Sequence, residues 1–229
     1  MSIRDGKDYL YLIWKSNSTG KQYIVGQLTK NGQYEFRYHE EVNSAIEEGF
    51  KPLVPFENLK EVYKCNELFP VFASRLPDRK RKDIDRILDK YGLQKFDAYQ
   101  LLKMSGAKLP IDRLYFIDPI LNFDGEFEKT FYLAGARHYL GCEGEDCVKA
   151  ISVTRGDEVF FERDKENKYD SNAIRVVNEN HSLLGYVPRY YAEAFVRIIE
   201  ENRVLSCHVM NVDKNKSCDE CIAVAVKIM

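Results

Sequence analysis

The stretch that most constrains the fold is residues 160–188, FFERDKENKYDSNAIRVVNENHSLLGYVP. It holds two runs patterned as β-strands, a polar loop between them, and a closing Gly-Tyr-Val-Pro segment that leads into a helix. The loop, Asn167–Ala173, is short and rich in side chains that make directed hydrogen bonds. This combination indicates one wall of a small binding pocket.

The chain around this stretch is also patterned as strands. Residues 130–134 are apolar, strands are predicted over 157–162, 173–178, 183–187 and 203–212, and residues 222–228 alternate strictly. A helix starts at Pro188, and its apolar face comprises Tyr191, Ala194, Phe195, Ile198 and Ile199. Five or six strands, with one helix between the fourth and the fifth, predict a small β-barrel of the OB or SH3 type.

The first half combines strands with helices. Strands are predicted over 9–14, 23–29 and 34–38, with Asn31-Gly32 as a hairpin turn, followed by a closing strand over 113–117. Helices are predicted over 42–48, 67–75 and 78–91, and a further helix between Asp97 as its cap and Gly106 as its end. The chain is therefore expected to be α+β, with an antiparallel meander and helices before the barrel.

The length of 229 residues permits one large domain or two small ones. Turn-forming residues at 118–125 separate the two patterned regions, so we place a domain boundary near residue 122, giving domains 1–121 and 122–229. No apolar run approaches the ~20 residues of a membrane span, and the N-terminus lacks the pattern of a signal peptide. The cytoplasm is the expected compartment.

Charge differs between the two halves. Residues 1–120 contain 20 Lys and Arg against 17 Asp and Glu, whereas residues 121–229 contain 14 against 19. A protein that tracks many phosphates needs a basic face, so nucleic-acid binding by the second half must depend on a local site. The run 79–82 (RKRK) suggests a phosphate-binding patch, but three nearby aspartates favour a solvated helix turn.

Residues 25–38 (VGQLTKNGQYEFRY), with Trp14 upstream, resemble the amino-terminal subdomain of HipA-type Ser/Thr kinases, the toxins of bacterial toxin–antitoxin pairs. Residues 68–92 and 96–106 are similar to the helices of the same subdomain, so the resemblance covers about residues 10–117. No kinase glycine loop, His-Asp catalytic loop or Asp-Phe-Gly follows. The resemblance implies a protein partner rather than kinase activity.

The second half resembles the HIRAN domain, through Leu-Ala-Gly-x-Arg-x-Tyr, then Asn-x-Tyr-Asp-x-Asn-Ala, then Leu-Gly-Tyr-Val-Pro and a helix. In the best-described relatives this barrel captures the 3′ end of a single DNA strand. The resemblance implies a pocket with two sides: Arg137, His138 and Tyr139 on one, and Asn167, Tyr169, Asp170 and Asn172 on the other. Position 138 departs from the DNA-binding relatives, which have Tyr there.

The chemistry of these groups suits a strand end. An aromatic ring can stack on a terminal base, Arg137 can engage a phosphate, and Asp170 can accept a hydrogen bond from a free 3′-hydroxyl while repelling a phosphate. The alternative is structural: Asp170 and Asn172 can satisfy backbone groups of a tight loop, and Arg137 can be the ion partner of Asp170.

Four of the six cysteines form two pairs, Cys142 with Cys147 and Cys218 with Cys221. If the fold brings these two loops together, four thiolates can hold one structural zinc ion; otherwise they are free thiols. Cys65 and Cys207 are expected in the core.

The leading hypothesis is a non-catalytic protein in which the barrel recognises single-stranded DNA 3′ ends, or another nucleic-acid end. Its first domain would dock a protein partner, either a HipA-like kinase or a DNA-repair factor. The alternative is a regulatory or antitoxin-like subunit of a HipA-type kinase system. An enzyme is disfavoured, because no metal-binding pair of acidic residues accompanies Arg137, His138 and Asp170.

Overall fold

The computed structural model of the protein describes residues 8–120, 126–140, 142–143, 146–147, 151–203, 205–216 and 218–228. The chain divides into two compact units, Met1–Pro119 and Ile120–Met229. The boundary predicted near residue 122 falls among residues outside the described ranges. None of the described helices is long and apolar enough to cross a membrane.

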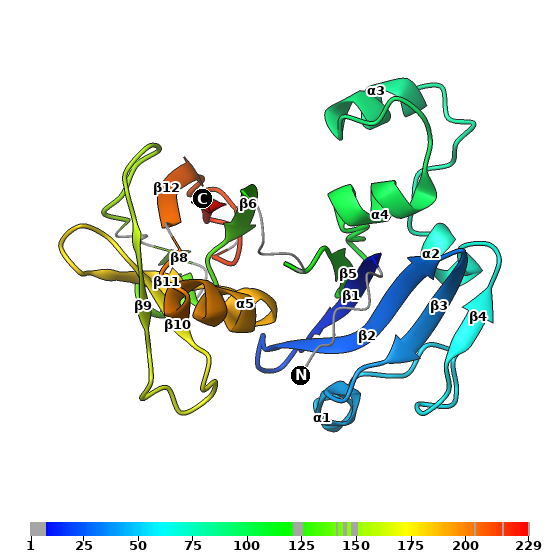
Figure 1. Ribbon diagram of the computed structural model, residues 1–229, viewed down its shortest axis with the longest axis horizontal. Coiled ribbons are helices and arrows are strands. Elements are labelled where there is room, and N and C mark those ends of the chain that lie inside the picture. Colours follow the sequence, from blue (N-terminus) through cyan, green and yellow to red (C-terminus); the bar gives the residue numbers. More distant parts are fainter. Residues whose placement is uncertain are drawn as a thin grey trace. The chain divides into compact units, whose positions relative to one another are not determined.

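The first unit is built on an antiparallel sheet of five strands in the order β4-β3-β2-β1-β5 (Figure 1). The strands are β1 (Asp8–Lys15), β2 (Gln22–Asn31), β3 (Gln33–Tyr38), β4 (Tyr63–Cys65) and β5 (Leu114–Ile117). The predicted meander and closing strand are present, and the short edge strand β4 was not predicted. The core contains packed aromatic rings: Phe36 stacks on Phe56 with ring centroids 4.4 Å apart, and it meets Phe72 edge-on at 5.2 Å.

Over its described residues, 8–119, this unit has four α-helices beside the sheet: α1 (Val42–Glu47), α2 (Pro70–Ala73), α3 (Ile84–Lys90) and α4 (Ala98–Ser105). The carboxylate of Asp97 accepts hydrogen bonds from the first backbone amides of α4, and Gly106 ends the helix at a φ of 68°.

Two predicted helices are too long. The helix predicted over 67–75 begins only at Pro70, because the residue before a proline disfavours the helical region. The helix predicted over 78–91 begins at Ile84, since Asp78 bonds the backbone amide of Lys80 and holds the preceding residues in turns.

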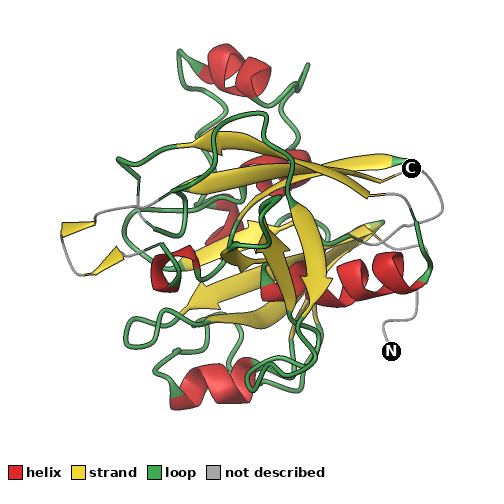
Figure 2. Ribbon diagram, turned by 90° about the vertical axis from the view of Figure 1, so that its left-hand side faces the viewer, coloured by secondary structure: helices red, strands yellow, loops and turns green. Residues whose placement is uncertain are grey.

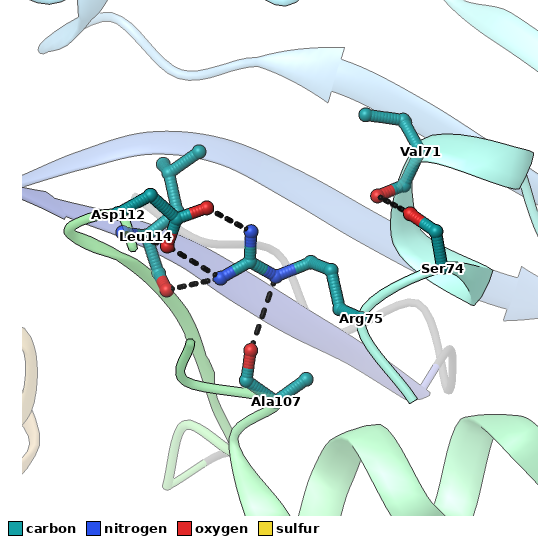
Figure 3. A network of polar contacts seen from close by, with 6 residues as sticks. All are labelled: Val71, Ser74, Arg75, Ala107, Asp112 and Leu114. Carbon is teal, nitrogen blue, oxygen red and sulfur yellow. Dashed lines mark hydrogen bonds and ion pairs between the residues drawn. The ribbon is translucent and has the colours of Figure 1, made fainter. Parts of the chain in front are cut away.

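A buried arginine fixes the loop between α4 and β5 (Figure 3). The Arg75 side chain is 6% exposed, and its guanidinium donates to both carboxylate oxygens of Asp112 and to the carbonyls of Ala107 and Leu114. Burial alone would raise the pKa of Asp112, but the hydrogen bonds and charge of Arg75 hold that pKa below its ordinary value.

The second unit contains two antiparallel three-stranded sheets, ordered β11-β10-β9 and β12-β13-β6, and a separate β7-β8 hairpin. The elements are β6 (Phe127–Tyr132), β7 (Cys142–Glu143), β8 (Asp146–Cys147), β9 (Phe160–Arg163), β10 (Ile174–Val177), β11 (Leu183–Tyr186), β12 (Leu205–Val212) and β13 (Ile222–Ile228). Helix α5 (Arg189–Glu200) lies between β11 and β12 in sequence, as predicted.

Isolated bridges join the two sheets at both pairs of edges. Ala134, just after β6, pairs with Tyr186 of β11, and Glu158, just before β9, pairs with His208 of β12. The six strands thus follow one another around a barrel whose two seams are single bridges rather than continuous ladders. Phe195 of α5 packs against Phe131 of one sheet and Phe161 of the other, so the helix contributes to the core between them. The predicted α+β class and barrel-like second half are confirmed.

Candidate functional site

The first side of the predicted pocket is the short 3-10 helix η1 (Ala136–His138), which follows β6. Gly135 starts it at a φ of 70°. The backbone of Ala134 and that of Tyr186 exchange two hydrogen bonds of 2.8 Å, which place η1 beside the end of β11. This approach requires Gly185, since a β-carbon there would lie 2.9 Å from the carbonyl oxygen of Ala134.

Tyr186 connects the residue that follows η1 to the residue that follows β9, the strand on the far side of the sheet. Its ring centroid lies 5.8 Å from that of Tyr139, and its hydroxyl donates to the carboxylate of Asp164 at 2.8 Å. Burial and this hydrogen bond raise the pKa of Tyr186 to about 12, so the phenol stays protonated at neutral pH. The hydrogen bond from Tyr186 in turn holds the pKa of Asp164 below its ordinary value.

Asp164 continues the connection into the Asn167–Ala173 loop. The same Asp164 oxygen accepts a hydrogen bond from the side-chain amide of Asn167 at 3.2 Å. The side-chain oxygen of Asn167 then accepts from the backbone amides of Tyr169 and Asp170, at 3.0 and 3.2 Å. A chain of contacts therefore runs from Tyr139 through Tyr186 and Asp164 to the loop that was predicted as the opposite wall.

Two further contacts shape the loop. Asp170 accepts a hydrogen bond from the backbone amide of Asn172 at 2.9 Å, and Arg163 of β9 donates to the carbonyl of Ser171 at 3.2 Å. The structural alternative thus holds for one oxygen of Asp170, which satisfies a loop amide. The side chain of Asn172, which that alternative also named, makes no hydrogen bond to a described backbone group. Asn167, which it did not name, satisfies two loop amides. Between the described side chains of Arg137 and Asp170 there is no ion pair.

The loop and η1 leave several groups open to solvent. Tyr169 is 92% exposed and Tyr139 is 45% exposed, so both rings present a face that a flat ligand can cover. Arg137 and His138 are exposed, and Asp170 and Asn172 are half-buried. The ring of His138 lies 6.3 Å from that of Tyr139 in an edge-on arrangement. The site can offer stacking faces, one guanidinium and one carboxylate.

Sequence reasoning missed two residues of this site, Tyr186 and Asp164. Tyr186 lies within the Leu-Gly-Tyr-Val-Pro segment, which was interpreted as a strand end leading into a helix and was given no side-chain role. Asp164 precedes the loop by three residues. The sequence shows only a tyrosine at the end of one predicted strand and an aspartate just after another, and this pattern does not indicate how the strands pair.

The predicted zinc ligands fall partly outside the described residues. The backbones of Cys142 and Cys147 lie directly opposite each other in the β7-β8 hairpin, and their side chains are not described. Cys221 is buried, and its thiol donates to the carbonyl of Cys218 at 3.3 Å. Among the described side chains, no group of three or more His, Cys, Asp or Glu could hold a metal ion.

The two cysteines predicted in the core differ in depth. Cys207 on β12 is buried, which raises the pKa of its thiol to about 12. Cys65 on the edge strand β4 is half-buried and packs against the core of the first unit.

Solved structures that resemble the chain are HIRAN domains and one further protein. The crystal structure of the HIRAN domain of human HLTF shares 23% identity, with a TM-score of 0.34, and the match covers 45% of this chain and 74% of that one. The NMR structure of the HLTF HIRAN domain in its DNA-bound conformation shares 21% identity, with a TM-score of 0.30 and coverage of 46% and 74%. A protein from Lactobacillus plantarum shares 22% identity, with a TM-score of 0.36 and coverage of 45% and 97%.

Family comparison assigns both units. No curated protein sequence matches the chain. The HipA N-terminal domain family matches residues 19–110, and the HIRAN domain family matches residues 128–228. Both resemblances expected from the sequence are confirmed: residues 19–110 form a HipA N-terminal domain, and residues 128–228 form a HIRAN domain.

Proposed function

We propose that this chain is a non-catalytic nucleic-acid-binding protein whose HIRAN domain captures the 3′ end of single-stranded DNA. The observation that carries the proposal is the chain of contacts from Tyr139 through Tyr186 and Asp164 to Asn167. It connects both predicted walls of one site and leaves the Tyr139 and Tyr169 rings exposed. The DNA-bound conformation of a similar HIRAN domain agrees with this ligand class.

Each exposed group has a separate task in this proposal. Tyr139 and Tyr169 stack on the terminal bases, an interaction worth roughly 1–3 kcal/mol per base that reads no sequence. Arg137 contacts the nearest phosphate, as a planar fork of donors. Asp170 accepts a hydrogen bond from the 3′-hydroxyl through lone pairs not used by the Asn172 amide, and its negative charge disfavours a 3′-phosphate.

The test compares two oligonucleotides that differ only at the 3′ end. We expect fluorescence anisotropy at low salt to show tighter binding of a 3′-hydroxyl strand than of a 3′-phosphate strand. Asp170→Asn should remove most of this preference, because the uncharged amide no longer repels the phosphate.

Asp157→Asn is the matched control, since the Asp157 carboxylate also accepts a loop amide, that of Thr154 at 2.8 Å, on another loop of the same unit. Equal binding of the two ends by the wild type, or an equal loss of preference in both variants, would overturn the proposal.

A second candidate function follows from the first unit. A HipA N-terminal domain followed directly by a HIRAN domain suits a subunit that binds and restrains a separate HipA-type kinase. Co-expression with a HipA-type kinase from the same gene neighbourhood, followed by co-purification, tests this role. A kinase that is not retained by the full chain would exclude it.

We also propose that Cys142, Cys147, Cys218 and Cys221 hold one structural zinc ion, which would tie the β7-β8 hairpin to the loop before β13. Thiol modification of the purified chain in the presence of a zinc-sensitive dye should release one equivalent of metal. Release of less than half an equivalent would exclude the site.

A further inference from the structure

The second feature that a nucleic acid could contact lies in the first unit, on residues 78–95, here called the basic segment. It contains seven Lys and Arg and four Asp and Glu, whereas the other residues of 1–120 contain 13 of each. The whole positive surplus of the first half of the chain is therefore concentrated in these 18 residues.

The basic segment stands apart from the sheet of its own unit. Figures 1 and 2 show α3 held on loop segments at both ends, away from the strands. Of the seven residues of α3, only Leu88 is buried, and no residue of α3 belongs to the main aromatic core of the first unit. Packing in the core of the first unit therefore does not account for the presence of the basic segment.

The cations of the basic segment differ in their partners. Arg81 forms a two-pronged ion pair with Asp83, whose pKa is lowered mainly by the hydrogen bond from Arg81 and slightly by the charge of Arg86. Arg79, Lys80 and Lys82 are exposed and form no ion pair with any described residue. They lie within four consecutive residues just before α3, so three cationic side chains that are close in sequence face solvent.

We propose that Arg79, Lys80 and Lys82 form a phosphate-contacting surface that binds the backbone of single-stranded nucleic acid without sequence preference. Exposed cations free of carboxylate partners are the groups that displace counterions from a phosphate chain. The choice of nucleic acid over an acidic protein rests on the proposed function of the HIRAN domain. The phosphate-contacting surface lies in the first unit, and it can bind a nucleic-acid strand that has no free 3′ end.

The experiment uses the full chain and closed circular single-stranded DNA, which has no 3′ end. We expect Arg79→Gln, Lys80→Gln and Lys82→Gln together to reduce the slope of log affinity against log salt by about 2, at roughly 0.7 per lost phosphate contact.

The control variant removes three other exposed cations of the same unit, through Lys21→Gln, Lys51→Gln and Lys60→Gln. It lowers the net charge of the chain equally, but it should leave the slope almost unchanged.

Three outcomes would overturn the proposal: no measurable binding of circular DNA, an equal change of slope in both variants, or displacement of the DNA by poly-glutamate as readily as by poly-thymidine. The result is separable from the strand-end proposal, because 3′-hydroxyl preference is read with linear strands and Asp170→Asn.

Discussion

Two polar networks, one in each unit, connect segments that are distant in the sequence, but they differ in exposure. Arg75 in the first unit is buried, and its donors bond to Asp112 and to two backbone carbonyls. Tyr186 in the second unit is half-buried, and its network ends beside exposed rings. A closed network holds a loop in place, whereas an open network also positions groups that remain available to a ligand. The proposed binding site therefore lies beside the second network, whose neighbouring rings remain exposed.

The largest expected effect comes from breaking the closed network. Arg75→Ala leaves the Asp112 carboxylate and two carbonyls without their donor, so we expect the free energy of unfolding of the first unit to fall by about 3 kcal/mol. The fluorescence of Trp14, the single tryptophan, reports this unit during urea unfolding.

Arg81→Ala is the matched control for Arg75→Ala, because it removes a similar two-pronged ion pair that is about half exposed on each partner. It should leave the urea midpoint nearly unchanged. If both variants shift the urea midpoint equally, burial of the Arg75–Asp112 ion pair does not make it more stabilising than the exposed Arg81–Asp83 pair.

The next effect concerns the close approach between Gly185 and the carbonyl oxygen of Ala134, next to the open network. Gly185→Ala places a β-carbon against the carbonyl oxygen of Ala134, and we expect it to destabilise the second unit by about 2 kcal/mol. It should also weaken capture of a 3′-hydroxyl strand, since η1 and β11 must move apart. Thermal unfolding followed by near-ultraviolet circular dichroism, together with anisotropy, measures both consequences. If the variant is destabilised but binds the strand as the wild type does, the close approach of Ala134 to Gly185 is not required for binding.

A smaller effect tests the open network directly. Tyr186→Phe keeps the ring beside Tyr139 but removes the hydrogen bond to Asp164, which contributes about 1 kcal/mol. We expect roughly fivefold weaker binding of 3′-hydroxyl strands, the change that corresponds to that energy. Hydrogen exchange at the amides of Tyr169 and Asp170 should become faster.

Tyr132→Phe is the control for Tyr186→Phe, because it removes a phenol that contacts Lys216 at 3.3 Å on the other sheet. It should change neither strand binding nor exchange in the Asn167–Ala173 loop. An equal effect of both variants would indicate a general loss of stability rather than positioning.

The smallest effect is a dependence on pH. The pKa of Asp164 is lowered by folding, so its contribution to stability is present above the ordinary aspartate pKa and is lost as pH falls through the lower, folded value. The pKa of Tyr186 is raised to about 12, so its contribution is lost as pH rises from about 10 towards 12. The difference in melting temperature between wild type and Asp164→Asn should therefore be constant near pH 7 and shrink below pH 4. A constant difference down to pH 2 would contradict this assignment.

Local patterns predicted most of the secondary structure. Alternation identified the strands around Phe36 and Val224, and the cap at Asp97 and the glycine at 106 bounded α4. The start of α3 and the edge strand β4 were not predictable from periodicity. The start of α3 depends on the Asp78 side chain, which accepts a hydrogen bond from the backbone amide of Lys80. Strand β4 depends on its pairing with β3.

The site was predicted less completely than the fold. Although their ligand-binding role stays a prediction, the residues proposed for both walls could be named from short sequence motifs. Tyr186 and Asp164 could not, because they are 22 residues apart and their hydrogen bond depends on how β9, β10 and β11 pair. Likewise, sequence could not decide between a ligand role and a loop role for Asp170, and the structure gives one of its oxygens to Asn172.

The bridge between Ala134 and Tyr186 has a mechanical consequence. Two backbone hydrogen bonds close this edge of the barrel, whereas whole ladders hold β10 and β13. The same Tyr186 that closes the edge through its backbone connects the two walls of the site through its side chain. Any molecule that holds η1 and the Asn167–Ala173 loop together would therefore also hold this single-bridge edge closed, and binding would increase the resistance of the domain to opening at that edge.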